Sequence, residues 1–282
     1  MKTSLDCIPC FVRQALDAAR MVSADPVVHE RMVREVLLWA GEMSLEEPPV
    51  LLGTRIRRRL RELTGVADPY RAAKDHQNQM AQNLLSELRR EIEDAPDPLA
   101  MAARLAIAGN VIDMGVNGNI TEADVRRSIQ HALAEPFSGE WEAFCQAAAM
   151  ARRILYLADN AGEIVFDRLL IEQLSPARTT LAVRGAPVLN DATLVDARAA
   201  GLDQIVEIID NGSDVAGTLL PECSRGFLER FAEADMIIAK GQGNFETLSN
   251  EPRDIFFLFK AKCPVITMDT GMEPGSLVLM NH

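Results

Sequence analysis

Short apolar runs separated by segments of helical length mark the second half of the chain. The runs are rich in Ile, Leu, Val and Met and occupy residues 154–158, 179–183, 204–209, 236–239 and 264–268. Amphipathic segments lie between them, at 163–174, 192–200, 221–233 and 252–260. Strands that alternate with helices in this way form βαβ units around a largely parallel sheet. The sequence therefore predicts an α/β, Rossmann-like fold from about residue 151 onward.

The first half shows helical periodicity alone. Apolar residues recur at helical spacing in several stretches separated by Pro-containing breaks, at 7–22, 26–43, 51–63, 70–93 and 98–108. Further helix starts are expected near residues 121 and 138. We therefore expect an all-helical domain at 1–150, followed by a Rossmann-like α/β domain at 151–282 that carries the functional site.

The charge balance excludes one class of partner. The 282 residues contain 29 Lys and Arg against 41 Asp and Glu, a formal net charge of −12. A duplex nucleic-acid binder needs a basic face, so no nucleic-acid partner is expected. No apolar run approaches the ~20 residues that span a bilayer, and no apolar signal segment opens the chain. These features predict a cytoplasmic protein without a membrane partner, and leave its oligomeric state unknown.

Two of the five cysteines form a CxxC motif, Cys7 to Cys10. This spacing occurs in metal sites and in thiol redox sites. A zinc site usually has four protein ligands, however, and neither a second CxxC nor an HxxxH follows. A structural role and a metal or redox role both stay open for this pair.

Polar residues follow the expected strands at 159–163, 184–193, 210–214 and 240–246. The carboxyl ends of parallel strands meet at one edge of the sheet, where open α/β folds bind their ligands. Capping explains a single Asp or Asn in such a loop. Four loops rich in carboxylates, amides and cations favour a functional site instead.

The residue types indicate phosphoryl chemistry. Asp159, Asn160 and Asp191 offer the hard oxygen donors that suit a divalent cation such as Mg²⁺ or Mn²⁺. Lys240 and Arg184 are cations expected on the same edge, where they complement phosphate oxygens. A metal that polarises a phosphate ester and cations that hold its charge are the usual parts of such a site.

A nucleotide-cofactor site fits less well. The first turn of the expected sheet lacks the glycines of GxGxxG, and no P-loop occurs in the chain.

A further Asn, Asp and Gly cluster spans residues 109–119 in the helical half. It is either a turn that caps a helix or a polar wall that the helical half contributes to a cleft.

These motifs resemble the signatures of the ARMT-like family of metal-dependent damage-control phosphatases, formerly a domain of unknown function. The resemblance rests on GNxxD at 109–113, DNAGE at 159–163, the segment 184–193 and KGQGNFE at 240–246. With the CxxC at the start, the chain is similar to the compact stand-alone prokaryotic branch. The Arg-Thr-x-Lys motif of the eukaryotic branch is absent, so that branch's substrate preference does not carry over.

The resemblance implies a helical domain packed on a Rossmann-like domain, with Mn²⁺, Ni²⁺, Co²⁺ or Mg²⁺ in the cleft. It implies metal ligands at Asp159, Asn160 and Asp191 and an anion-binding Lys240. It also implies hydrolysis of phosphate monoesters of small metabolites, including sugar phosphates and phosphopantetheine-type compounds. One branch of the family is described as a carboxyl methyltransferase.

We therefore interpret the chain as a metal-dependent phosphatase acting on a small phosphorylated metabolite. The residues expected to bind the phosphate are Asn110, Arg184, Lys240 and Asn244. The candidates for general base are Asp113, Glu163 and Asp214, among which the sequence does not choose.

Two other hypotheses stay open. One is an S-adenosylmethionine-dependent carboxyl methyltransferase on the same fold. The other is a non-enzymatic metal-binding or regulatory protein that depends on Cys7 and Cys10.

Overall fold

The computed structural model describes residues 1–110, 121–134 and 138–281. The strands in this part of the chain form one sheet in the order β1-β7-β6-β5-β2-β3-β4. Their bounds are β1 Ser138–Gly139, β2 Ile154–Leu157, β3 Thr179–Val183, β4 Glu207–Asp210, β5 Met236–Lys240, β6 Ile255–Lys260 and β7 Leu277–Asn281. Neighbouring strands are parallel except β6 and β7, which run antiparallel. The predicted α/β class with a largely parallel sheet is confirmed.

The described helices fall into two groups along the chain. Those before β2 are α1 Cys7–Val22, α2 Pro26–Glu42, α3 Val50–Thr64, α4 Arg71–Glu93, α5 Pro98–Ala108, α6 Glu122–Ala134 and α7 Trp141–Met150. Those that connect the strands are α8 Glu163–Gln173, α9 Leu194–Ala199, α10 Arg225–Glu233, α11 Gly241–Leu248 and α12 Pro264–Thr270. Three-residue 3₁₀ turns occur at Pro176–Arg178, Leu202–Gln204 and Leu220–Glu222.

Local signals in the sequence explain where several helices begin. The Asp97 side chain accepts a hydrogen bond from the Ala100 amide at 3.0 Å, and Pro98 occupies the first turn of α5. Asp25 caps α2 in the same way, by accepting from Val27 at 2.9 Å. Such caps satisfy amides that have no partner inside the helix.

The order of the strands places a switch point at the middle of the sheet. The chain runs from β2 outward to β3 and β4, and returns to β5 on the other side of β2. Open α/β folds bind their ligands at the carboxyl ends of the strands where the order reverses. In this chain that position lies between Asp159, just after β2, and Lys240, the last residue of β5.

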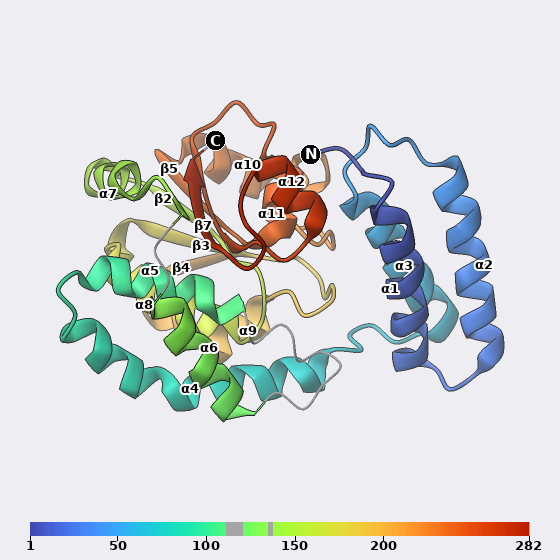
Figure 1. Ribbon diagram of the computed structural model, residues 1–282, viewed down its shortest axis with the longest axis horizontal. Helices are drawn as coiled ribbons and strands as arrows, with labels where there is room; N and C mark the ends of the chain where they lie inside the picture. Colours follow the sequence, from blue (N-terminus) through green and yellow to red (C-terminus); the bar gives the residue numbers. More distant parts are fainter. Residues whose placement is uncertain (111–120, 135–137, 282) are drawn as a thin grey trace.

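Helices cover both faces of the sheet. Ile154 and Tyr156 of β2 belong to a buried apolar cluster that also contains residues of α4, α5, α6 and α8. Leu155 and Leu157 belong to a second cluster with residues of α1, α2, α3, α10, α11 and α12. Figure 1 shows α1, α2 and α3 side by side at one end of the molecule and α4 along the helices beneath the sheet.

Each apolar cluster contains residues from both sides of residue 150. The division into domains at 1–150 and 151–282 stays a prediction. Among the described helices, none combines the length and apolar character that a membrane span requires.

Two expectations near the end of the chain are wrong. Residues 252–260, expected to be helical, contain β6, and residues 264–268, expected to be a strand, lie in α12. The sequence of β6, Ile-Phe-Phe-Leu-Phe-Lys, is aromatic and buried between β5 and β7, where such residues favour a strand. Pro264 suits the first turn of a helix, where its missing amide hydrogen has no intrahelical partner to lose. The strand expected at 204–209 also begins later, at Glu207.

Candidate active site

The turns that follow β2 and β3 lie side by side at the carboxyl edge of the sheet. Asn160 and Asp191 form an isolated antiparallel bridge between them. The Ala192 amide also donates to the Asp159 carbonyl at 2.7 Å. The backbone therefore holds together the two turns that carry Asp159, Asn160 and Asp191.

A cavity of about 450 Å³ lies at these turns, and we call it the carboxyl-edge cavity. Both halves of the chain line it, since α1 and α3 contribute as well as α11. Asn110, directly after α5, lines it too. The residues that the two turns contribute are Asp159, Asn160, Leu189, Asn190 and Asp191.

Hydrogen bonds orient the two amides beside the cavity. Asn160 Nδ2 donates to Asp159 Oδ2 at 2.7 Å and to Glu163 Oε2 at 3.2 Å. Asn110 Nδ2 donates to the same Glu163 oxygen at 2.7 Å. Because the amide nitrogen of Asn160 is turned toward two carboxylates, its carbonyl oxygen is the atom left to act as an acceptor or a ligand.

Arg184 lies behind the carboxylates and is absent from the cavity lining. Its Nε donates to Asp191 Oδ2 at 2.6 Å, and its Nη2 lies 3.7 Å from Asp159 Oδ1. Its Nη1 donates to Asn244 Oδ1 at 3.3 Å. Burial raises the pKa of Asp191, an effect that the Arg184 guanidinium opposes. In this arrangement Arg184 and Asn244 hold the carboxylates in place from below.

Lys240 is fully buried and makes contacts away from the cavity. Its Nζ donates to Glu163 Oε1 at 2.8 Å, to Asp167 Oδ1 at 2.6 Å and to the Ala106 carbonyl at 2.8 Å. Burial by itself lowers the pKa of Lys240, but the two carboxylates outweigh burial and raise it. Burial raises the pKa of Asp167 to about 6, although Lys240 opposes the shift. Lys240 thus anchors Glu163, which in turn orients Asn110 and Asn160.

The candidates for general base lie outside the cavity lining or outside the described residues. Glu163 is buried beneath the cavity and bound to Lys240. Asp214 pairs with Arg58 at 2.6 Å and also with Arg61, and these hydrogen bonds lower its pKa against the effect of burial. Asp113 lies outside the residues that the structure describes.

The sequence analysis missed two buried polar residues of α4 that hold the turns. Asn78 Oδ1 accepts from the Gly162 amide at 2.7 Å, and Lys74 Nζ donates to the Asp191 carbonyl at 3.2 Å. Together with Gln77 they form a polar stripe at helical spacing on a helix whose other buried positions are apolar. The signal in the sequence was the presence of polar residues at helical positions that continue the apolar stripe of α4.

The donors at the two turns fit a hard dication. Two carboxylates and one amide oxygen are ligands that Mg²⁺ and Mn²⁺ accept, with further positions left for water or substrate. Over residues 1–110, 121–134 and 138–281, no group of three or more His, Cys, Asp or Glu side chains is arranged to hold a metal. Asp159, Asn160 and Asp191 include only two such residues, so their role as ligands stays a prediction.

The CxxC motif also reaches this cavity. Cys7, Cys10 and Cys263 line it, and all three are free thiols. Burial raises the pKa of Cys7 and of Cys10, and the Cys10 sulfur accepts a hydrogen bond from Gln14 at 3.2 Å. A raised pKa disfavours the thiolate at neutral pH. The structural alternative and the metal or redox alternative stay open.

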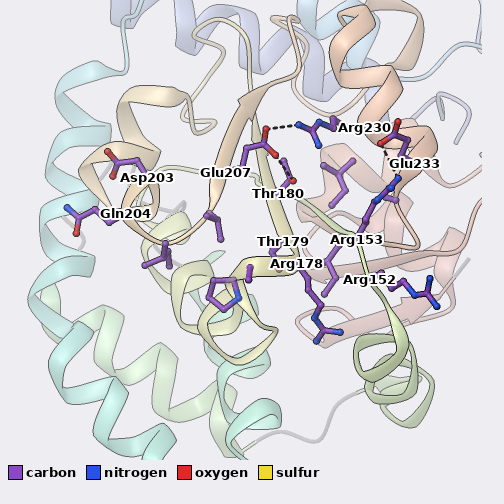
Figure 2. A pocket seen from close by; sticks show the side chains of 17 residues that line it. Arg152, Arg153, Arg178, Thr179, Thr180, Asp203, Gln204, Glu207, Arg230 and Glu233 are labelled. Carbon is purple, nitrogen blue, oxygen red and sulfur yellow. Dashed lines mark hydrogen bonds and ion pairs between the residues drawn. The ribbon is translucent and has the colours of Figure 1, made fainter.

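A second hollow lies at the opposite, amino edge of the sheet (Figure 2). Four of its charged side chains form two ion pairs, since Arg230 contacts Glu207 at 2.7 Å and Arg153 contacts Glu233 at 3.2 Å. Arg178 is bound to the Ala151 carbonyl at 2.5 Å. These contacts occupy the guanidinium groups of Arg153, Arg178 and Arg230, whereas polar residues of the two turns line the carboxyl-edge cavity. We therefore place the candidate active site at the carboxyl edge.

The fold and the cavity define an α/β protein with a helix-covered cavity at the switch point of a mostly parallel sheet. The signature of the damage-control phosphatase ARMT1-like domain matches residues 3–278. The chain belongs to this family.

Archaeal proteins resemble the chain over its whole length. A damage-control phosphatase of Pyrococcus horikoshii is 34% identical over 289 residues, covering 100% of this chain and 99% of the relative. A damage-control phosphatase of Archaeoglobus fulgidus is 34% identical over 285 residues, covering 99% and 98%. The crystal structure of a DUF89 family protein from P. horikoshii matches with a TM-score of 0.90 and 32% identity, and the match covers 100% of this chain and 99% of that chain.

Proposed function

We propose that the chain is a metal-dependent phosphatase that hydrolyses phosphate monoesters of small metabolites. The observation that carries the proposal is the bridge between the turns after β2 and β3, which brings Asp159, Asn160 and Asp191 to one cavity. Membership of a family whose named relatives are damage-control phosphatases supports the phosphatase activity. The dependence on a metal and the class of substrate are further parts of this proposal.

Asp159, Asn160 and Asp191 would hold the dication, which we propose to be Mn²⁺, Ni²⁺, Co²⁺ or Mg²⁺. When bound, such an ion polarises a phosphate ester and lowers the pKa of water. The surrounding residues orient these three side chains. Arg184 neutralises Asp191 from behind, and Glu163 fixes the amide of Asn160.

The cavity sets the size of the substrate. Its volume of about 450 Å³ falls within the range of small-molecule sites and suits a sugar phosphate or a phosphopantetheine-type fragment. Among the predicted phosphate-binding residues, Asn110 lines the cavity, whereas Arg184, Lys240 and Asn244 lie beneath it. The predicted general bases Glu163 and Asp214 do not line the cavity and are held in ion pairs.

A metal-supplemented activity screen tests the proposal. Purified protein is assayed with p-nitrophenyl phosphate and a panel of phosphorylated metabolites, before and after EDTA, and with Mn²⁺ or Co²⁺ restored. We expect EDTA to abolish hydrolysis, the metal to restore it, and Asp159→Ala to lack it. Full activity of Asp159→Ala would defeat the mechanism.

The same preparation separates the two other hypotheses. Metal-independent, saturable binding of S-adenosylmethionine would favour the methyltransferase. Negligible turnover of every substrate, with metal content or partner binding lost in Cys7→Ser, would favour a non-enzymatic protein.

A further inference from the structure

The arginines of α3 divide into one that lines the carboxyl-edge cavity and four that contact other side chains of the chain. Arg55 stacks over the Trp39 ring at 4.2 Å, and Arg59 binds Glu35 at 2.7 Å. Arg58 and Arg61 both bind Asp214. Arg57 instead lines the carboxyl-edge cavity.

The guanidinium of Arg57 is incompletely satisfied. Its Nη2 lies 3.4 Å from the Thr54 hydroxyl, and its Nε is buried without a hydrogen-bond partner. Within the described part of the chain, no carboxylate forms an ion pair with it. Burial lowers the pKa of Arg57, and the more distant carboxylates of Asp191 and Asp214 oppose this shift. A buried donor without a partner is costly, and it is therefore rare unless a ligand or water completes the site.

Gly53 leaves room for this guanidinium. A Cβ added at Gly53 would lie 3.2 Å from Nη1 and 3.3 Å from Nη2 of Arg57, closer than an ordinary contact. Gly is unfavourable inside a helix by roughly 1 kcal/mol relative to Ala, yet it occupies the fourth position of α3 and lines the same cavity. The helix thus accommodates the half-buried guanidinium beside the cavity.

Arg57 is also the one Lys or Arg among the described residues that line this cavity. Lys240 and Arg184, the cations expected from the sequence, are bound to carboxylates beneath it. We propose that Arg57, from the helical half, binds the phosphate group of the substrate. A planar guanidinium binds phosphate oxygens in a two-point geometry, which an ammonium group does not.

This inference rests on the proposed phosphatase function, and direct binding of inorganic phosphate tests it separately from turnover. Calorimetry with and without Mn²⁺ measures the affinity of the wild type, Arg57→Gln, Arg57→Lys and the control Arg59→Gln. We expect Arg57→Gln to weaken phosphate binding at least tenfold and to raise the KM for p-nitrophenyl phosphate similarly. Arg57→Lys should retain part of the affinity. Arg59 pairs with Glu35 and does not line the cavity, so the phosphate affinity of Arg59→Gln should stay within twofold of the wild type.

The thermal stability of the same variants distinguishes a binding role from a structural one. Because Arg57 has no ion-pair partner in the described residues, Arg57→Gln should leave Tm unchanged or raise it, while the rise in Tm caused by phosphate disappears. A residue that only supports the fold would lower Tm instead. If Arg57→Gln proves too unstable to purify, a structural role is indicated and the inference fails.

The outcomes for function and inference are distinct. Wild-type turnover with unchanged phosphate affinity in Arg57→Gln and Arg57→Lys would overturn the inference and leave the phosphatase intact. Phosphate binding that depends on Arg57 without any turnover would support the inference and overturn the phosphatase. Absence of phosphate binding to the wild type, even with Mn²⁺ present, would overturn the role of Arg57.

Discussion

Lys240 neutralises two carboxylates that would otherwise be buried without a counter-charge. Glu163 and Asp167 are both fully buried, and each lies within 2.8 Å of its ammonium nitrogen. The exchange of one partner of a buried ion pair leaves an uncompensated charge, which costs more than the pair itself contributes. The position of Lys240 therefore indicates a residue that holds the site together.

The substitution Lys240→Met tests this interpretation. We expect it to lower the free energy of unfolding by about 3–5 kcal/mol, measured by urea denaturation. Lys2→Met, which removes an exposed lysine paired with Glu46, is the control and should change stability by less than about 1 kcal/mol. Unchanged stability of Lys240→Met together with lost phosphate binding would place Lys240 at the substrate instead.

Glu246 gives the cavity a pH-dependent charge. It lines the cavity, and burial raises its pKa from 4.5 to about 7. The folded protein therefore keeps this proton up to about pH 7, whereas the unfolded chain loses it near pH 4.5. Stability should fall as the pH rises between these values, by at most about 3 kcal/mol, and the slope should disappear in Glu246→Gln.

The same ionisation should act on the substrate. Above pH 7 the Glu246 carboxylate adds negative charge beside the phosphate, so the KM for p-nitrophenyl phosphate should rise from pH 6 to pH 8 in the wild type. In Glu246→Gln the KM should be flatter over this range. A wild-type KM that is independent of pH would contradict the assignment.

The sequence predicted that the turns after β2 and β3 lie together, but it did not single out Arg57. Asp159 and Asp191 lie in the turns that follow the adjacent parallel strands β2 and β3, and the topology of such sheets brings the ends of those strands together. Arg57 lies in a helix with arginine at five of seven consecutive positions, 55–61. Which of these five lines the cavity depends on packing between α3 and the sheet half, and helical spacing alone does not reveal it.

At the scale of elements, α11 begins against the carboxylate of Asp159. Gly241, the first residue of α11, has a φ of +78°, and a Cβ there would lie 1.9 Å from Asp159 Oδ2. An L side chain would be strained in this conformation and would also displace the carboxylate. The glycine therefore allows the helix and the turn after β2 to meet.

We expect Gly241→Ala to reduce Mn²⁺ affinity and phosphatase activity at least tenfold. The control is Gly226→Ala in α10, where an added Cβ meets no atom within 4 Å and the φ is ordinary. That substitution should leave activity unchanged and stabilise the protein by up to about 1 kcal/mol. Isothermal titration with Mn²⁺ and the rate of p-nitrophenyl phosphate hydrolysis measure both effects. Wild-type metal affinity in Gly241→Ala would show that Asp159 is not positioned by this contact.

The elements that the sequence misassigned are those whose state depends on their neighbours. Residues 255–260 are apolar at five of six positions, and a short continuous apolar run fits a buried helix or a buried strand. Hydrogen-bonded pairing with β5 and β7 stabilises these residues as the strand β6. In contrast, the helices with strong caps, such as α2 and α5, agree closely with the expected ranges.

At the scale of the whole molecule, both halves of the chain line the carboxyl-edge cavity. The sheet half contributes the two turns and α11, and the helical half contributes Asn110, Gly53 and Arg57 to the same cavity. The alternation of strands and helices predicted the sheet. The placement of α3 over its carboxyl edge did not follow from the sequence, because it depends on contacts between distant segments.

A crystal of the protein grown with Mn²⁺ provides the most direct test of the central claim, that Asp159, Asn160 and Asp191 together hold a dication. An anomalous-scattering map locates manganese without reference to activity. The account predicts a single strong peak about 2 Å from an oxygen of each of these three side chains. A peak elsewhere, or none at these turns in a preparation whose activity requires Mn²⁺, would contradict it.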